Sequence, residues 1–364
     1  MLRRWLAPSK ALASLSQPRR PLQPRYSLAL ARSCADQAPR STDLAFEQPF
    51  VLQEVPGRGL GAIATKDLEP GDVVLLERPI LAVRSDESGD EWNHDLHEQY
   101  KALPEEAQAE VWELHDACLQ KPEKSLEGIL FTNCIGRDQT VRFDAALCIH
   151  LSRFNHSCRP NLEQSWDEDA GNARLVASMP VKEGEELFTH YVDLRLPRAE
   201  RRQRLHESYG FWSCPKDGIC PVCGQPDSAD SDKRRIEMSR INGHLRKEKT
   251  NFERCERMVK KVLKLFDQEG LAMLSWRKMH CLTAMESALS RGDVPAAVHW
   301  ARRAYENARL AHGPDHRDTR FCAELTKDPS SHPDFEHRTQ NVKNLGTWVA
   351  AMAATFVVYT VLKY

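Results

Sequence analysis

Short apolar runs separated by turn signals fill the chain from Phe50 to Val83 (FVLQEVPGRGLGAIATKDLEPGDVVLLERPILAV). Such β-branched pieces, punctuated by glycine and proline, are typical of small strands. Within this stretch, Leu68–Asp72 (LEPGD) forms a turn, because proline presets one φ angle and glycine accepts the unusual one. The same texture returns at Asn172–Val192, where VKEGEE supplies a second glycine turn. The pattern therefore predicts two strand-rich stretches.

The pattern between these stretches is helical from Glu91 to about Gln120. Val111, Leu114 and Leu119 lie near one helical stripe, and the preceding PEE suits a first helical turn. We expect a helical insert at about residues 90–127. Strand-like residues are predicted to resume with GILFTNCIG at Gly128–Gly136.

The chain is helical again from Cys223 to about Leu325. At Gly292–His316, a GD turn, a helix and a GPDH turn follow an earlier helix, which resembles one tetratricopeptide-type (TPR-like) unit. Five small residues in this segment would let two helices approach closely: Ala296, Ala297, Ala301, Ala304 and Ala308. We therefore predict an α-helical, TPR-like domain over residues 229–326.

The first 35 residues are rich in arginine, contain serine and have no acidic residue before Asp36. This composition is typical of a mitochondrial presequence. Pro18, Pro21 and Pro24 would however break a long amphipathic helix. Residues 1–46 are thus either a basic N-terminal tail or a mitochondrial presequence.

A polar linker at 327–344 leads to the apolar stretch Leu345–Leu362, which contains no charge. As a helix this stretch would be about 27 Å long, close to a hydrocarbon core of about 30 Å. Its apolar residues surround the helix, so we expect it to be in a membrane or buried. We predict that residues 345–364 form a C-terminal tail anchor on an intracellular membrane. The alternative is a helix packed on the TPR-like region, with the protein in the nucleus or cytoplasm.

The net charge of −1 argues against a dedicated nucleic-acid binder. The basic run Lys233–Lys264 is the one feature that favours such a function, and we interpret it as a solvated helix face. The chain has eleven cysteines, an odd number, and no secretory signal. A disulfide framework is therefore not expected, and a reducing compartment is.

The densest group of chemically capable side chains is RFNHSCRPN at Arg153–Asn161, where an amide, an imidazole and a thiol fall within four positions. A Cys/His nucleophile pair, a metal ligand and a cofactor cradle are all compatible with it. Gly57, Gly59 and Gly61 could let a backbone lie flat against a ligand. No long helix follows these glycines, which disfavours a dinucleotide-binding βαβ unit.

Four motifs in order narrow these alternatives: GRGLGA at Gly57–Ala62, NHSCRPN at Asn155–Asn161, GEELFTHYVD at Gly184–Asp193 and GFWSCPKDGICPVCG at Gly210–Gly224. In that order they resemble SET-domain protein lysine methyltransferases of the SMYD-like branch and its fungal relatives. The resemblance covers about residues 50–227.

The resemblance implies a mixed β+α fold. It predicts a SET domain of small sheets with a pseudoknot at residues 47–210, interrupted by the helical insert, and a Cys-rich zinc post-SET segment at 211–228. SMYD proteins carry a MYND zinc finger between the two halves of this domain. Here that interval contains only Cys118, so MYND-based contacts are not expected.

The same resemblance implies S-adenosyl-L-methionine (SAM) as cofactor and Tyr191 as the catalytic tyrosine. Asn155 and His156 would belong to the strand that cradles the cofactor, with His156 acting through backbone and packing and not as a base. Either Phe211 or Trp212 would pack on the adenine. The full predicted set of cofactor-binding residues is Arg58, Gly59, Asn133, Asn155, His156, Tyr191, Phe211 and Trp212.

A zinc site is predicted from clustered cysteines. Cys214, Cys220 and Cys223 give three thiols, one short of a tetrahedral Zn²⁺ site. The resemblance supplies Cys158 as the fourth ligand. The spacer PKDGI between Cys214 and Cys220 is longer than the usual C-x-C-x2-C arrangement of the family.

The predicted function is SAM-dependent transfer of a methyl group to a lysine of a protein substrate by a monomeric enzyme. The alternatives are a catalytically inactive SET/TPR-like scaffold that binds protein partners and a zinc-dependent nucleic-acid binder. No specific nucleic acid is expected as a partner, and a membrane is expected only through the C-terminal helix.

Overall fold

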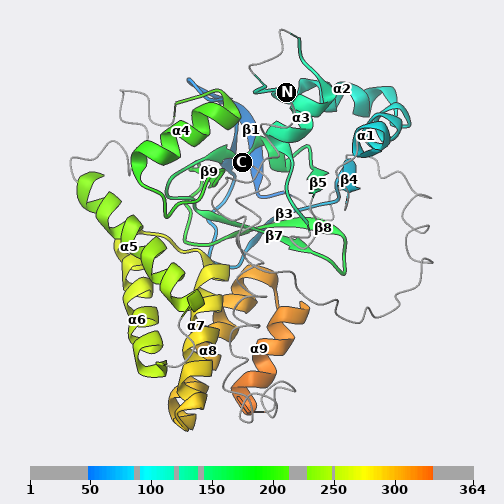
Figure 1. The fold of residues 1–364 in the computed structure, drawn as a ribbon. Coiled ribbons are helices and arrows are strands. Elements are labelled where there is room, and N and C mark those ends of the chain that lie inside the picture. The colour runs from blue at the N-terminus through cyan, green and yellow to red at the C-terminus, as the bar shows by residue number, and fades with distance from the viewer. Residues whose placement is uncertain are drawn as a thin grey trace.

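The computed structural model describes residues 48–85, 91–118, 123–137, 143–212, 228–247 and 251–330. Small sheets occupy the centre of the molecule, with helices α1–α3 on one side and α4 on the other (Figure 1). Helices α5–α9 form a separate layer below the sheets in this view. The expected mixed fold with small sheets and a helical C-terminal region is confirmed.

The strands of the described residues form three sheets. The first has the order β1-β2-β9-β6, with β1 at Phe50–Val55, β2 at Gly59–Ala64, β9 at Glu186–Thr189 and β6 at Asn155–His156. The second has the order β3-β8-β7, with bounds Val73–Glu77, Asn172–Ala177 and Leu162–Asp167. The third pairs β4 (Leu81–Ser85) with β5 (Phe143–Leu147). One buried core includes Phe50 of β1, Leu75 of β3, Leu187 of β9 and Phe154, so the first two sheets share it.

Two helices of the insert, α1 (Glu91–Lys101) and α2 (Glu105–Glu113), lie where the helical pattern predicted them. The prediction of strand-like structure at Gly128–Gly136 is wrong, because α3 spans Leu126–Asn133. The Ser125 side chain caps this helix by accepting a hydrogen bond from the Gly128 N–H. A short apolar run does not distinguish a buried helix from a strand, and here the cap favours the helix.

The helical region consists of α5 (Ser228–Lys247), α6 (Phe252–Glu269), α7 (Leu274–Ser290), α8 (Val294–His312) and α9 (Arg317–Lys327), and α4 (Arg198–Tyr209) precedes it. Four of the five alanines singled out in α8 are fully buried: Ala297, Ala301, Ala304 and Ala308. Small side chains therefore line the core surface of α8, as expected from the sequence.

The interpretation of the basic run as a solvated face is wrong for one residue. Lys233, Lys260 and Lys261 are exposed, but Arg235 is completely buried. Arg235 faces the segment after β6 and not solvent, since it hydrogen-bonds the backbone of Cys158.

Several sequence predictions concern residues outside the described ranges. These are the N-terminal segment 1–46, the cysteines at 214, 220 and 223, and the apolar stretch Leu345–Leu362. Among the helices that the structure describes, none has the length and apolar character to cross a bilayer. The presequence and the tail anchor stay predictions from sequence.

The close packing of α8 predicts that Ala304→Leu destabilises the protein. Ala304 has no exposed surface, so the added side chain must displace its neighbours, at a cost of about 1–3 kcal/mol. Urea unfolding should show this loss. Arg302→Leu, at an exposed position of the same helix, is the control and should change stability by less than about 0.5 kcal/mol.

Candidate active site

The two central motifs meet where β6 pairs in parallel with β9. Asn155 lies opposite Phe188, and His156 lies opposite Thr189. The Ser157 N–H donates to the Thr189 carbonyl over 2.9 Å, which extends the contact by one residue. The pairing brings the NHSC and GEEL…Y motifs side by side.

Tyr191 follows β9, and hydrogen bonds fix both its backbone and its side-chain hydroxyl. Its backbone N–H donates to Nδ1 of His156 over 3.0 Å, and its hydroxyl donates to the Phe154 carbonyl over 2.7 Å. Because Nδ1 of His156 accepts, a neutral imidazole carries its proton on Nε2. The His156 side chain therefore orients Tyr191 through a hydrogen bond, a contact beyond the backbone and packing role expected from the sequence, and Nδ1 is not open for use as a base.

The Tyr191 ring is packed among aromatic side chains. Its centroid lies 4.7 Å from that of Tyr209 and 6.4 Å from that of Phe211. Burial raises the pKa of Tyr191 well above the ordinary value, with the negative charge of Glu186 and an ionised Tyr209 acting in the same direction. The phenol is thus neutral at physiological pH and is a hydrogen-bond donor.

A polar link joins Asn155 to the glycine loop. The Asn155 amide nitrogen donates to Oε1 of Glu186 over 2.9 Å and to the Leu60 carbonyl over 3.1 Å. The other oxygen of Glu186 pairs with Arg58 at 2.6 Å, and that guanidinium lies 5.3 Å from the Phe188 ring. Arg58 and Asn155, predicted as cofactor-binding residues, are thus connected through Glu186.

Glycine is needed at position 61 because three side-chain atoms approach its Cα. An added Cβ would lie 2.8 Å from Oε1 of Glu186, 2.8 Å from Val55 Cγ2 and 3.0 Å from the Asn155 amide nitrogen. At Gly59 an added Cβ would meet nothing within 4 Å, so the outer side of this loop is open. The loop packs against Asn155 on one side and leaves the other side accessible.

Sequence reasoning assigned no role to Glu186 or to Asn161. Asn161 donates to the Glu186 carbonyl over 2.9 Å and accepts from the Phe188 N–H over 2.7 Å, so it fixes β9 from the side of the NHSC motif. Both residues are inside the quoted motifs. Their place inside these motifs is the signal that could have pointed to them, but only the folded chain shows their partners.

Asn133, Phe211 and Trp212, also predicted to bind the cofactor, contact residues outside the paired strands β6 and β9. The Asn133 amide donates to the His115 carbonyl of the insert and to the Ile129 carbonyl of its own helix, α3. Phe211 is 39% exposed and contacts Tyr191 and Tyr209. Trp212 stacks on His206, with 4.0 Å between ring centroids. Of the two aromatic candidates, Phe211 is therefore the one beside Tyr191.

The structure describes one of the four predicted zinc ligands. Cys158 is buried, with its sulfur 3.5 Å from Nε2 of His156. Within the described ranges no three potential ligand side chains gather closely enough to hold a metal ion. A soft, buried thiol suits Zn²⁺, and the other three thiols lie in the segment outside the described ranges, so the zinc site stays a prediction.

Residues 59–192 match the family model of the SET domain. This stretch of the chain is therefore similar to SET domains. Histone-lysine N-methyltransferase set5 of Schizosaccharomyces pombe is 24% identical over 298 residues, which are 78% of this chain and 85% of set5. N-lysine methyltransferase SMYD2 of Mus musculus is 28% identical over 169 residues, or 45% of this chain and 36% of SMYD2. The chain thus spans about a third of the length of this SMYD2 relative, and the predicted resemblance is confirmed.

Among solved structures, the SET domain of LSMT bound to lysine and AdoHcy matches 82% of this chain and 88% of its own. The sequence identity is 15% and the TM-score is 0.29. The assignment of the SET domain therefore rests on the sequence family and on the motif geometry.

The environment of Tyr191 predicts that its phenol resists deprotonation. An ordinary tyrosine titrates near pH 10. Because burial raises the pKa of Tyr191, a difference titration at 295 nm between the parent and Tyr191→Phe should show no tyrosinate up to about pH 11. In urea the same difference should show a titration near pH 10. Since the folded pKa is the higher one, the stability contributed by Tyr191 is complete below the unfolded pKa and is lost as pH rises towards the folded pKa.

Proposed function

We propose that this SET-domain protein is a SAM-dependent protein-lysine N-methyltransferase. The observation that carries the proposal is the neutral Tyr191 hydroxyl, fixed 2.7 Å from the Phe154 carbonyl where the two SET motifs pair. Set5 and SMYD2, to which the chain is homologous, are named as lysine methyltransferases. Transfer to a protein lysine is the reaction that this similarity and geometry support together.

The residues around the glycine loop fit a ligand that carries ammonium and carboxylate groups. The loop is open at Gly59, and its neighbour Asn155 has both donor and acceptor atoms. The partly exposed Phe211 ring offers an apolar face beside Tyr191. These residues, with Arg58 and His156, would hold SAM, which supplies an activated methyl group on its sulfonium.

Methyl transfer to an amine is an in-line displacement, so the protein must align the reacting atoms and exclude water. The Tyr191 hydroxyl and the Phe154 carbonyl form a rigid polar pair that can orient the substrate amine. The target lysine must be neutral to attack. Desolvation and a nearby positive charge both lower a lysine pKa, so no protein base is required.

We expect Tyr191→Phe to reduce turnover by about 100-fold, the effect of a small misplacement of reacting groups. Its dissociation constant for SAM should stay within a few-fold, because the hydroxyl belongs to the alignment pair. The assay combines labelled SAM, a proteome extract and mass spectrometry of the labelled lysines, followed by kinetics on the substrate identified. Tyr100→Phe, whose hydroxyl bonds the Gln108 carbonyl within the insert, is the matched control.

Asn155→Ala should act on binding first. Loss of its links to Glu186 and Leu60 should weaken SAM binding at least tenfold, as expected for a hydrogen bond worth about 1.5–3 kcal/mol to a charged group. Calorimetric titration with SAM measures this. Undetectable SAM binding by the parent protein would instead favour the inactive scaffold.

We further propose that Cys158 shares a structural Zn²⁺ with Cys214, Cys220 and Cys223. The support is the buried Cys158 thiol together with the sequence spacing of the other three cysteines. Cys158→Ser should then lower bound zinc from one ion per chain to none and reduce the melting temperature, since structural zinc contributes folding energy. Elemental analysis of the purified chain is the measurement. Cys118→Ser, at a partly exposed position of the insert, should keep its zinc.

A further inference from the structure

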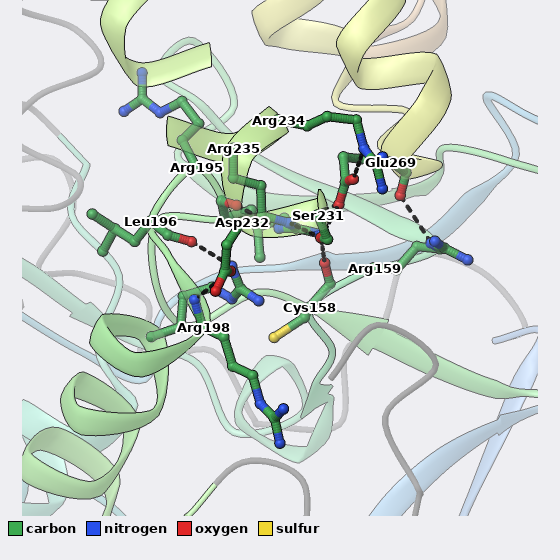
Figure 2. A network of polar contacts seen from close by, with 12 residues as sticks. Cys158, Arg159, Arg195, Leu196, Arg198, Ser231, Asp232, Arg234, Arg235 and Glu269 are labelled. Atoms are coloured by element: carbon green, nitrogen blue, oxygen red, sulfur yellow. Dashed lines mark hydrogen bonds and ion pairs between the residues drawn. The ribbon is translucent and has the colours of Figure 1, made fainter. Parts of the chain in front are cut away.

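A buried charged cluster joins the helical region to the SET domain. Its members, here called the α5–α6 clamp, are Ser231, Arg234 and Arg235 of α5 and Glu269, the last residue of α6 (Figure 2). Arg235 has 0% and Glu269 has 1% of its surface exposed. Charged side chains are rarely buried to this degree unless they are paired.

The Arg235 guanidinium contacts both motif segments of the site. Its Nη2 donates to the Cys158 carbonyl over 3.1 Å, and its Nη1 donates to the Leu194 carbonyl. Cys158 is two residues after His156, and Leu194 is three residues after Tyr191. One side chain of α5 therefore links the backbone of the segment that carries His156 to the backbone that carries Tyr191.

Glu269 fixes the orientation of that guanidinium. Its Oε2 accepts from Arg235 Nε over 2.9 Å and from the Ser231 hydroxyl over 2.6 Å, and its Oε1 accepts from Arg234. Burial alone would raise the pKa of Glu269, but these hydrogen bonds and the charge of Arg235 hold it below its ordinary value. The carboxylate is thus ionised and fully engaged.

A second contact connects the same helix end to the NHSC motif. The Glu269 carbonyl accepts from Arg159 Nε over 2.9 Å, and Gly270 follows with a positive φ of 63°. A Cβ at Gly270 would lie 2.8 Å from that Nε, so glycine is needed for both the backbone angle and the approach of Arg159. The end of α6 is therefore shaped to contact residues 158 and 159.

Stability alone does not account for this cluster. Buried ion pairs carry a large desolvation cost, and well-packed apolar residues often replace them without loss. What an arginine adds is a planar fork of five donors that sets the positions of several acceptors at once. Here two of these acceptors are the carbonyls beside the paired motifs.

We propose that Arg235, held by Glu269, is a positioning residue for methyl transfer, which sets the β6 segment against the Tyr191 segment. The inference rests on the proposed function and extends it to the helical region. Two hydrogen bonds depend on how these segments lie against each other. The Ser157 N–H donates to the Thr189 carbonyl, and the Tyr191 N–H donates to Nδ1 of His156. Small misplacements of aligned groups have large effects on rate.

The test uses the full-length chain with Arg235→Met/Glu269→Leu, which removes both members of the fully buried ion pair together. Arg234, the other charged partner of Glu269, has 32% of its side chain exposed and can be solvated. The turnover number should fall about 100-fold, with KM values for SAM and substrate within a few-fold. Hydrogen exchange at the Ser157 and Tyr191 amides should accelerate about tenfold, because their acceptors lie across the two segments. Arg235→Lys, which keeps the charge without the fork, should recover fold stability but not turnover.

The matched control is Arg291→Met/Glu256→Leu, another ion pair of the helical region, which is partly buried. Glu256 accepts from Arg291 and from Trp300 Nε1, and these contacts lie within α6–α8 and the turn after α7. This double variant should lower the melting temperature while leaving turnover and the exchange of the two amides as in the parent.

The exchange measurement separates this inference from the proposed function. If the parent protein methylates nothing, the proposed function fails, yet accelerated exchange at Ser157 and Tyr191 would still show that Arg235 fixes the two segments. Parent-like exchange at both amides in Arg235→Met/Glu269→Leu would overturn the inference. Equal acceleration in the Arg291 and Glu256 control would also overturn it, because the effect would then be general destabilisation.

Discussion

The site depends on a parallel pairing of only two residues, β6 against β9. Two residues provide few backbone hydrogen bonds, and parallel pairs are slightly weaker per residue than antiparallel ones. Polar side chains therefore complete the contact. His156 accepts from the Tyr191 N–H, and Asn161 binds the backbone on either side of Leu187, donating to the Glu186 carbonyl and accepting from the Phe188 N–H. The asparagines and histidine of the NHSCRPN motif are explained by this requirement as much as by ligand binding.

The helical region is tied to the SET domain by packing as well as by the α5–α6 clamp. Leu194, three residues after Tyr191, is buried in the core formed by α5–α9. The Ser275 N–H of α7 donates to Glu163 of β7 over 3.0 Å, and burial raises the pKa of that carboxyl. The Arg195 guanidinium lies 4.6 Å from the Trp276 ring centroid. A TPR-like unit that acted as an independent module would not need these contacts.

Much of this architecture could be predicted from local pattern. The glycine and proline residues between short apolar runs indicated where strands begin and end, and the alanines of α8 indicated a close helix contact. The α3 helix was missed because its apolar run is short and resembles a strand. The contact that decides for a helix is the N-terminal cap, in which the Gly128 N–H donates to the Ser125 side chain. Arg235 was missed for a different reason. It stands in a basic run whose neighbours are exposed, and only its partners, 41 and 77 residues earlier in the chain, distinguish it.

The order in which the ribosome delivers these partners has a consequence for folding. Arg58 meets Glu186 across 128 residues, and Arg159 meets the end of α6 across 110. Contacts so distant in sequence form slowly, because the loop must close before they contribute. During synthesis the motif segments therefore emerge long before α6 does, and the chain must wait with an incomplete site. Until then the backbone of residues 158 and 194 is without the hydrogen bonds of Arg235, and Arg159 is without its acceptor at the end of α6.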